Sequence, residues 1–305
     1  MNLMELTKKQ TLVFFIMIYG FVIFIGILVM NYGYSIAMNV LIVALLADII
    51  MTLIIFFFSI ITKNASLYDP YWSVIPIFIV FYWMILYQSF TLPVIMMFIA
   101  LLLWSARLTF NWWKNWHGFS SQDWRYDYLK QRAPRIYLIT NLFGIHLFPT
   151  IIVFLQLINS HEIIEKSSSN NSINVLFIFG FAISIVSVII QHFADKQMYE
   201  FRKGNQSKNS CIDNGLWKYS RHPNYLGELG LWLGVYIMYL STVNRVNLNI
   251  VYPILMVGLF LFISIPMMEK KLMKRPDYKE YKNKVSMLLP YRKNSQWSIT
   301  IQSLT

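Results

Sequence analysis

Long apolar runs dominate the chain, and short polar segments separate them. A transmembrane α-helix needs about 20 consecutive, mostly apolar residues. Runs that suit such helices are 11–30, 36–61, 74–87, 91–110, 136–158, 173–194, 225–241 and 250–267. The run 74–87 is short and contains Pro76, so it is the weakest of these candidates. The pattern predicts an all-α, polytopic integral membrane bundle of about 7–8 transmembrane helices.

Composition supports the membrane assignment, because 57% of the residues are hydrophobic and an ordinary soluble domain is about 45–50% apolar. The first run is too long for the core of a signal peptide and lacks a cleavage site of small residues, so we expect it to be retained. The single cysteine, Cys211, excludes an internal disulfide and a cysteine metal cluster. We expect no bound metal.

The net charge of +12 reflects membrane topology rather than nucleic-acid binding. If all the predicted helices span the membrane, both termini share one face with the loops after the second, fourth and sixth runs. Of the 26 Lys and Arg, only Lys166 and Arg245 fall on the other face. The positive-inside rule therefore places both termini in the cytoplasm. The membrane would be the endoplasmic reticulum in a eukaryote and the inner membrane in a bacterium, and the oligomeric state stays open.

Few polar residues interrupt the apolar runs, and such residues are costly in a bilayer and often functional. Asp48 is the only charged residue in 36–61, and Thr52, four residues on, shares its helical face. Arg107 and Asn111 have the same spacing at the end of the fourth run. Asp48 is a candidate catalytic acid, or else a buried partner for Arg107 or a tyrosine. Arg107 and Asn111 are candidate substrate contacts, or else residues that cap or snorkel at a helix end.

Two segments on the basic face combine cations with aromatic and amide side chains, namely 107–129 and 195–225. In "SRHPNY", Pro223 suits the first turn of a helix, and the free amide groups at a helix start favour an anion. Asn224 and Glu228 then project from one face of that helix, where Glu228 could bind a nucleotide, hold Arg221, or only compensate the helix dipole. These features predict a dinucleotide site at the membrane surface. Neither a Rossmann nor a P-loop motif is present.

At these residues the sequence resembles the DUF1295 group of the steroid 5-alpha-reductase-like membrane enzymes. The resemblance extends over most of the chain and rests on four stretches: "NASLYDPYWSVIP" (64–76), "RLTFNWWKNWHGFSSQDWRY" (107–126), "DNGLWKYSRHPNYLGE" (213–228) and "PMMEKKLMKRPDYKEYKNKVSMLLPY" (266–291). The third stretch is the most specific. The motif "SLYDPYWS" separates this group from the isoprenylcysteine-type methyltransferases, which look similar near "RHPNY".

The chain has no sign of a soluble domain, so we expect one membrane domain, 1–305, whose polar tail, 293–305, is loose. With the resemblance, we expect the substrate at the spans of 1–110 and the cofactor in 111–292. The resemblance implies that NADPH binds from the cytoplasmic side and that a lipid-like substrate enters from the bilayer. In related sterol reductases a Q-K-x-x-F-R segment binds the nucleotide, and here Met198 replaces the lysine of that motif, with Lys203 nearby. The expected cofactor-binding residues are Gln197, Arg202, Lys203, Trp217, Tyr219, Arg221, His222, Asn224, Tyr225, Glu228, Glu269, Tyr278 and Tyr281. The expected substrate contacts are Asp48, Thr52, Asp69, Trp72, Arg107 and Asn111, and the expected catalytic residues are Asp48 and Tyr225.

The sequence thus predicts an NADPH-dependent reductase of a carbon–carbon double bond in a lipid or sterol-like substrate. The steroid-reducing members use a glutamate and a tyrosine in early spans, and this pair has no motif match here. Asp48 is proposed as the acid only because of its position within an apolar run. Asp48 would have to hold a proton at neutral pH or act through a tyrosine. One alternative is a membrane methyltransferase that uses S-adenosylmethionine. Another is a lipid-binding membrane protein without catalytic activity.

Overall fold

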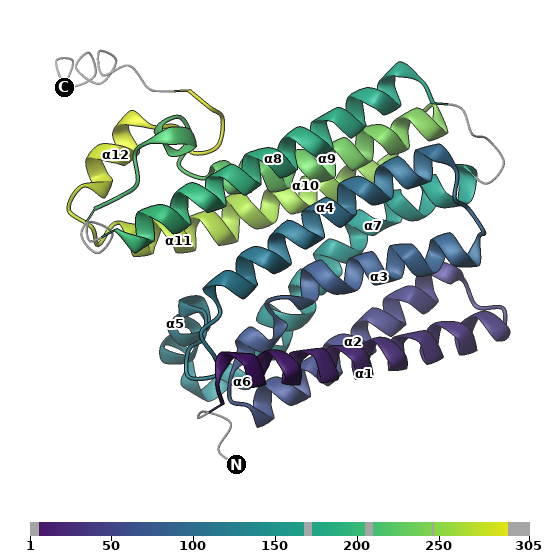
Figure 1. Cartoon of the computed structure of the whole chain (residues 1–305), viewed down its shortest axis with the longest axis horizontal. Helices are drawn as coiled ribbons and strands as arrows, with labels where there is room; N and C mark the ends of the chain where they lie inside the picture. Colours follow the sequence, from purple (N-terminus) through teal and green to yellow (C-terminus); the bar gives the residue numbers. More distant parts are fainter. Residues whose placement is uncertain (1–5, 168–172, 205–209, 246, 292–305) are drawn as a thin grey trace. The chain divides into compact units, whose positions relative to one another are not determined.

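The computed structural model describes residues 6–167, 173–204, 210–245 and 247–291. Within them the chain is helical, and the only β-pairing is an isolated bridge between Ser220 and Ser286. The described residues contain 8 helical stretches long and apolar enough to cross a membrane: Lys8–Ser35, Val40–Ile61, Ala65–Leu86, Leu92–Asn115, Pro134–Ser167, Val175–Lys203, Pro223–Val243 and Leu248–Leu272. The predicted all-α polytopic bundle is confirmed (Figure 1).

The weakest candidate, 74–87, is part of a longer stretch. A 3-10 turn, η2 (Ala65–Tyr68), precedes α3 (Tyr71–Leu86), and Pro76 lies inside α3. Proline removes one backbone donor, and it is tolerated best near the start of a helix. Hydropathy alone missed the start because η2 and the first turn of α3 carry the polar residues of "NASLYDPYWS".

The first of two compact units contains residues 1–174 and 239–245. Its long helices are α1 (Lys8–Ser35), α2 (Val40–Ile61), α3, α4 (Leu92–Asn115) and α7 (Phe148–Ser167). Within it α1 packs on α2, and α7 packs on α2, α3 and α4. The shorter elements are α5 (Trp124–Arg132), η3 (Pro134–Ile136), α6 (Tyr137–Ile139) and the π-helical segment η4 (Thr140–Leu147).

Polar side chains fix where several of these helices begin. Thr7 and Gln10 form a capping box at the start of α1, and Asn39 accepts two backbone N–H groups at the start of α2. Asp123 accepts the backbone N–H of Arg125 at the start of α5. Such caps satisfy amide groups that have no partner inside the helix, and each stabilises a helix by about 1 kcal/mol.

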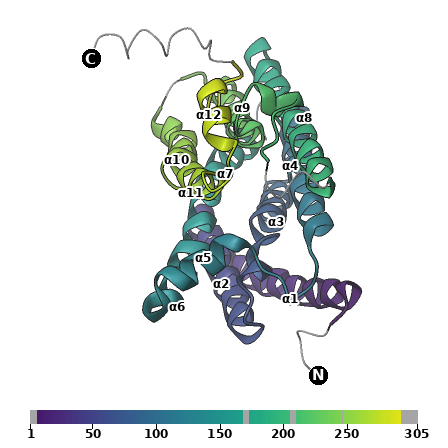
Figure 2. The same cartoon turned by 90° about the vertical axis from the view of Figure 1, so that its left-hand side faces the viewer.

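The second unit contains residues 175–238 and 246–305. Its helices are α8 (Val175–Lys203), α9 (Pro223–Val243, whose last residues belong to the first unit), α10 (Val251–Leu259), α11 (Ile265–Leu272) and α12 (Tyr278–Lys284). Short turns η6 (Gly215–Lys218) and η7 (Leu248–Ile250) and a π-helical segment η8 (Phe260–Ser264) connect them. Figures 1 and 2 both show α12 beside the segment that leads into α9.

The helices α8 and α9 approach each other along a row of small residues. A Cβ atom added to Gly234 would lie 2.6 Å from the carbonyl oxygen of Gly180, and one added to Gly227 would lie 2.7 Å from that of Ser187. The hydroxyl of Ser184 donates across this contact to the carbonyl oxygen of Leu231. Small residues let the backbones of membrane helices come this close.

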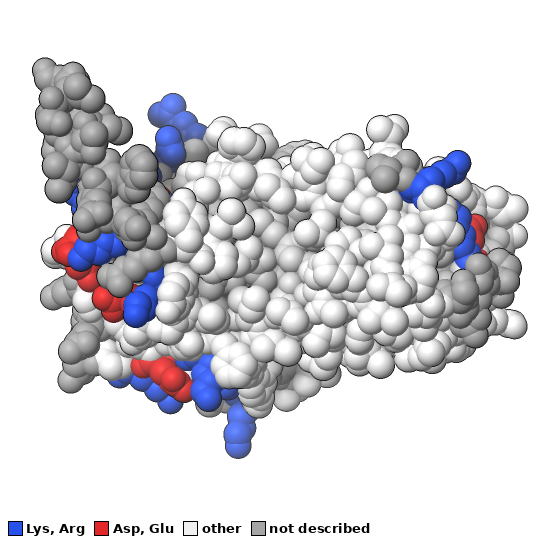
Figure 3. Space-filling model, turned by 90° about the horizontal axis from the view of Figure 1, so that it is seen from above, with Lys and Arg blue, Asp and Glu red and all other residues white. Residues whose placement is uncertain are grey.

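Exposed charged side chains avoid the middle of the apolar helices, whereas Asp48 on α2 and Glu228 on α9 are buried. In the view of Figure 3, Lys, Arg, Asp and Glu lie at the two ends, and the surface between them is free of charge. This distribution fits a multi-pass protein embedded in a lipid bilayer, because a charged side chain at the bilayer centre is costly. The orientation of the termini stays a prediction.

Candidate functional site

A buried carboxylate and a tyrosine meet inside the first unit. Asp48 on α2 is only 4% exposed, and its Oδ1 accepts a hydrogen bond of 2.8 Å from the hydroxyl of Tyr71 on α3. The Tyr71 hydroxyl also lies 2.9 Å from the backbone oxygen of Asp48. The sequence offered Arg107 or a tyrosine as a buried partner for Asp48, and the observed partner is a tyrosine, Tyr71.

Hydroxyl groups continue from this pair. The Oγ1 atoms of Thr52 and Thr150 are 3.0 Å apart, and the Tyr68 hydroxyl lies 2.8 Å from Thr150 Oγ1. The rings of Tyr68 and Tyr71 stack with centroids 5.2 Å apart. All of these residues are buried. The prediction that Thr52 shares a face with Asp48 is therefore confirmed, whereas Tyr68, Tyr71 and Thr150 were not predicted as site residues.

His146, on η4, borders the same cluster. Its ring lies against Tyr68, with centroids 4.8 Å apart, and its Nδ1 is 3.0 Å from the backbone oxygen of Asn141. A carbonyl oxygen only accepts, so Nδ1 carries the proton and Nε2 of the neutral ring is an acceptor. That Nε2 atom is buried and has no hydrogen-bond partner among the described residues. Its place in η4 is a further signal, since π-helical segments are frequent at functional sites.

Two motifs of the resemblance bind each other in this unit. Asn64 Nδ2 donates to the carbonyl oxygens of Phe119 and Ser121, each at 2.9 Å. The Tyr126 hydroxyl donates to Asp69 Oδ1 at 2.5 Å, and burial raises the pKa of Tyr126 well above its ordinary value. The segment 118–126 thus fixes the turn that carries Tyr68 and Tyr71. This contact gives Asp69 a structural role, and its expected contact with substrate stays a prediction.

The other expected substrate contacts lie on α3 and α4. The ring of Trp72 meets Trp104 edge-on, with centroids 6.3 Å apart. Asn111 accepts from the side chain of Asn115, one turn further along α4. Arg107 is half-buried on the same helix. None of the described hydrogen bonds joins Trp72 or Asn111 to Asp48.

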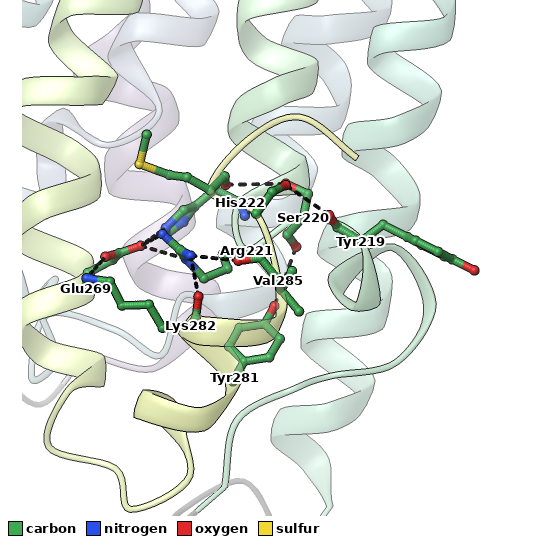
Figure 4. A network of polar contacts seen from close by, with 10 residues as sticks. Tyr219, Ser220, Arg221, His222, Glu269, Tyr281, Lys282 and Val285 are labelled. Atoms are coloured by element: carbon green, nitrogen blue, oxygen red, sulfur yellow. Dashed lines mark hydrogen bonds and ion pairs between the residues drawn. The ribbon is translucent and has the colours of Figure 1, made fainter. Parts of the chain in front are cut away.

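A second polar cluster lies in the second unit, at the start of α9 (Figure 4). Arg221 is 6% exposed, and its Nε and Nη2 atoms lie 2.9 and 2.8 Å from Glu269 Oε1 on α11. Its Nη1 donates to the carbonyl oxygens of Lys282 and Val285 at the end of α12. Lys282 Nζ binds the other oxygen of Glu269 at 2.8 Å. Arg221 therefore joins α9, α11 and α12.

This arrangement leaves little of Arg221 for a phosphate. A guanidinium has five N–H donors, and four of them point at the partners just described. Phosphate binding by Arg221 stays a prediction. The observed contacts assign it a structural role that the sequence did not reveal, because its partners lie far away in the chain.

His222 and Tyr225 form a stacked pair at the helix start. Their rings are 5.2 Å apart and nearly parallel, and Tyr225 also packs on Phe260. His222 Nε2 lies 3.5 Å from Glu269 Oε1. Burial lowers the pKa of His222 from its ordinary value, although Glu269 opposes this effect. As predicted, the helix begins at Pro223, and Asn224 accepts from the backbone amide of Tyr225.

Glu228 binds its own helix and the neighbouring one. It is 4% exposed; its Oε2 accepts from Gln191 Nε2 on α8 at 2.8 Å, and its Oε1 accepts from Trp232 Nε1 at 3.0 Å. The carboxylate that holds Arg221 is Glu269. These two hydrogen bonds account for a carboxylate in an apolar helix, because buried donors need an acceptor.

Gln197 and Trp217 also have structural partners. Gln197 Oε1 accepts the backbone amide of Leu216 at 3.0 Å, beside Gly215, whose φ of +55° suits glycine. Trp217 donates to the backbone oxygen of Ala194 and packs with Met198 and Phe201. The tyrosines expected to bind the cofactor differ in exposure: Tyr219 is 47% exposed, whereas Tyr278 and Tyr281 are buried together. Lys203 lies over the ring of Tyr199, and Arg202 is exposed near the end of α8.

A cavity of about 540 Å³ lies beside the Arg221 cluster. One wall comes from the segment before α9 and the other from α12 and the residues that flank it. The lining residues are Cys211, Asp213, Asn214, Gly215, Lys218, Asp277, Glu280, Tyr281, Lys284 and Val285. Tyr281 and Val285 line the cavity, and the backbone oxygen of Val285 also binds Arg221. The volume is in the range of small-molecule sites, about 300–1,000 Å³. No group of three or more His, Cys, Asp or Glu in the described residues could hold a metal ion.

Comparison with known sequences identifies the group to which these clusters belong. The profile of a family described as "Protein of unknown function (DUF1295)" matches residues 55–285. The chain belongs to the DUF1295 family. An uncharacterized protein of Schizosaccharomyces pombe is similar to it, with 24% identity over 288 residues, which cover 86% of this chain and 83% of the yeast protein. No solved structure matches the chain.

The DUF1295 match covers the two clusters unequally. It includes Tyr68, Tyr71 and Thr150, and it includes the whole Arg221 cluster with its cavity. Asp48 and Thr52 precede its first residue, 55. The family model thus describes the turn with Tyr68 and Tyr71 and the α9–α12 region, whereas Asp48 is supported only by its burial and its bond to Tyr71.

Proposed function

We propose that this DUF1295 protein is an integral-membrane reductase of a carbon–carbon double bond in a lipid or sterol-like substrate, with NADPH as reductant. The observation that carries the proposal is the Asp48–Tyr71 hydrogen bond, buried among apolar helices. Ionisable groups at such positions are costly and mark functional sites. A carbonyl-activated double bond is the feature that we assign to the substrate.

The chain's own residues would supply the proton. When bound, NADPH provides a hydride to the β-carbon of the activated double bond. Negative charge then develops on the substrate carbonyl oxygen, and a hydroxyl donor stabilises it. Tyr71 supplies that hydroxyl and Asp48 orients it, and Thr52, Tyr68 and Thr150 continue the hydroxyl chain through which a proton is replaced.

The residues of the second unit fit a dinucleotide in part. Protein partners already bind Arg221, Glu228 and Glu269. These side chains therefore hold the helices in place and have little hydrogen-bonding capacity left for a ligand. The neighbouring cavity has the volume for half of a dinucleotide, and its lining includes Lys218 and Lys284. Binding at the cavity, with the other half directed toward His222 and Tyr225, is therefore the arrangement that we propose.

The decisive experiment uses the full chain in lipid nanodiscs. A total lipid extract supplies candidate substrates, and NADPH oxidation is followed by the loss of its near-ultraviolet absorbance. Mass spectrometry then identifies the reduced lipids. Tyr71→Phe and Asp48→Asn should lower turnover by about 10²–10⁴-fold, the usual contribution of a positioned acid. Tyr82→Phe is the matched control, because the Tyr82 hydroxyl binds Asn31 at an exposed position.

The rival functions have their own outcomes in the same preparation. Stabilisation by S-adenosylmethionine and not by NADPH would favour a methyltransferase and contradict the proposal. Stabilisation by neither, together with a tightly co-purifying lipid, would favour a lipid-binding protein. Unchanged turnover in both Tyr71→Phe and Asp48→Asn would remove this pair from the mechanism.

A further inference from the structure

A dense group of cations begins where the last membrane stretch ends. Residues 270–284 contain seven Lys and Arg and two carboxylates, so the net charge of this short stretch is +5. We call residues 270–291 the interfacial segment. We propose that the interfacial segment is a docking surface for anionic phospholipids of the surrounding bilayer. The inference does not depend on the proposed reductase activity.

The first half of the interfacial segment is held at the level of the membrane surface. The stretch Leu248–Leu272 is long and apolar enough to cross a membrane, and Glu269 lies in its last turn. Lys282 Nζ on α12 binds Glu269 Oε2 at 2.8 Å, and the backbone oxygen of Lys282 accepts from Arg221 at 3.0 Å (Figure 4). These contacts fold α12 back against the end of the membrane stretch.

The second half of the segment is attached to the start of another membrane helix. The backbone amide of Arg221 donates to the carbonyl oxygen of Ser286 at 3.0 Å, and Ser286 forms the isolated bridge with Ser220. The helix α9, which is also long and apolar enough to cross a membrane, begins two residues later, at Pro223. The interfacial segment therefore lies beside the ends of two membrane helices.

The cations of the segment fall into two groups. Those with partners in the protein include Arg275, Lys282 and Lys284. Lys274 and Lys279 are exposed, and neither forms an ion pair within the described residues. Lys274 follows Leu272 by two residues, so their Cα atoms lie within about 7 Å of each other. That distance is less than the Debye length of about 8 Å at physiological salt, so the charge of Lys274 acts on lipid head groups.

Apolar side chains of the segment are exposed together with these lysines. Met273, directly before Lys274, is 49% exposed, and Leu289 and Tyr291 are 65% and 53% exposed. Exposure of apolar groups to water is unfavourable, whereas the interface of a bilayer suits both apolar and tyrosine side chains. The positive-inside rule explains the sign of the charge but not these apolar neighbours. Cations and apolar groups together match a lipid, which offers a phosphate and an acyl chain.

The experiment titrates the full chain in non-ionic detergent and measures binding by calorimetry. The probes are short-chain phosphatidylserine, short-chain phosphatidylcholine, glycerophosphoserine and inorganic phosphate. We expect phosphatidylserine to bind at least about thirtyfold more tightly than phosphatidylcholine, since each exposed lysine contributes about fivefold. Lys274→Gln combined with Lys279→Gln should therefore weaken phosphatidylserine by about thirtyfold. Lys9→Gln combined with Lys130→Gln is the matched control, because it removes the same charge from exposed positions outside the segment.

A further variant separates a lipid from a free phosphate. Met273→Ser keeps every cation and removes an apolar side chain that a lipid would cover. It should weaken phosphatidylserine by about fivefold and leave the affinity for inorganic phosphate unchanged. Melting temperatures without lipid check that the variants are folded, and Met273→Ser carries the test if the double lysine variant is not.

The outcomes are distinct. A loss of phosphatidylserine affinity in the Lys274 and Lys279 variant, with an unchanged control, supports the docking surface whether or not the protein reduces a lipid. Equal affinities for phosphatidylserine and phosphatidylcholine would overturn it, as would glycerophosphoserine or phosphate that binds as tightly as the lipid. Wild-type affinity in the double lysine variant would also overturn it. An equal loss in the Lys9 and Lys130 control would do the same, because the attraction would then come from the total charge and not from this segment.

Discussion

Arg221 and Glu269 form a buried ion pair that connects the segment before α9 with α11. Arg221 Nε and Nη2 lie 2.9 and 2.8 Å from Glu269 Oε1, and the side chains of Arg221 and Glu269 are 5% and 10% exposed. The same guanidinium binds two carbonyl oxygens at the end of α12. A residue that resembles a phosphate ligand in the sequence is thus the link that holds three helices in position.

The first prediction concerns the stability of this link. Arg221→Met should lower the free energy of unfolding by about 3–5 kcal/mol, because it leaves Glu269 buried without its main partner. Lys282→Met, which removes the half-exposed lysine from the same carboxylate, should cost about 0–1 kcal/mol. Melting temperatures in detergent compare the two variants. Equal losses in both would contradict the assignment of Arg221 as the main contact.

The second prediction separates the charge of Glu228 from its shape. Glu228→Gln keeps an acceptor for Trp232, and its new amide can donate to Gln191 Oε1, which has no partner among the described residues. We expect a loss below about 1 kcal/mol. Glu228→Leu should cost about 2–6 kcal/mol, because the donors of Gln191 and Trp232 both lose their acceptor at about 1–3 kcal/mol each.

Measurement of cofactor affinity on the same Glu228 variants tests the alternative role, in which Glu228 binds the dinucleotide. A Glu228→Gln protein that melts like the wild type but binds the dinucleotide more weakly would return Glu228 to the cofactor site. Unchanged affinity would leave it as the acceptor for two buried donors.

The third prediction concerns the close contact of α8 and α9. Gly234→Ala would place a Cβ atom 2.6 Å from the carbonyl oxygen of Gly180 and 2.2 Å from Ser184 Oγ, so the helices must separate. We expect a loss of at least about 1–3 kcal/mol, the cost of overpacking. Gly20→Ala on α1 is the matched control, because nothing lies within 4 Å of its added Cβ. It should be neutral or stabilising by about 0.5–1 kcal/mol.

The fourth prediction is a pH dependence. Burial lowers the pKa of His222 in the folded protein, with Glu269 opposing the shift and Arg221 reinforcing it. The unfolded chain, with an ordinary pKa of about 6.5 for histidine, then binds the proton more readily. The contribution of neutral His222 to stability is complete above about pH 6.5 and is lost as the pH falls below that value. Melting temperatures at pH 7.5 and 5.5 should differ less for His222→Gln than for the wild type, and an equal difference would refute this role.

The fifth prediction is the orientation of the termini. Because only Lys166 and Arg245 among the 26 Lys and Arg lie on the opposite face, a reporter fused after Thr305 should be accessible from the cytoplasm. Protease protection of sealed vesicles measures this. A reporter that is accessible only from the outer or lumenal side would reverse the topology.

The sequence determined the features that depend on neighbouring residues. Membrane insertion responds to the hydropathy of about 20 consecutive residues, so the apolar runs located the membrane helices. The runs missed several polar helix ends, such as the start of the third stretch at η2 and the end of the fifth, Pro134–Ser167. Helical spacing placed Thr52 on the face of Asp48, and the fixed φ of Pro223 placed the start of α9.

The tertiary structure decided which polar groups meet. Tyr71 reaches Asp48 from another helix, Glu269 reaches Arg221 across 48 positions, and Gln191 reaches Glu228 across 37. No local pattern encodes such pairs, because a polar side chain in an apolar environment is satisfied by whichever helix packs against it. Arginine and glutamate form strong, directional hydrogen bonds. The same bonds can bind a nucleotide or join two helices, so the sequence does not distinguish the two roles. Only the packing of α8, α9, α11 and α12 determines which partner uses those bonds.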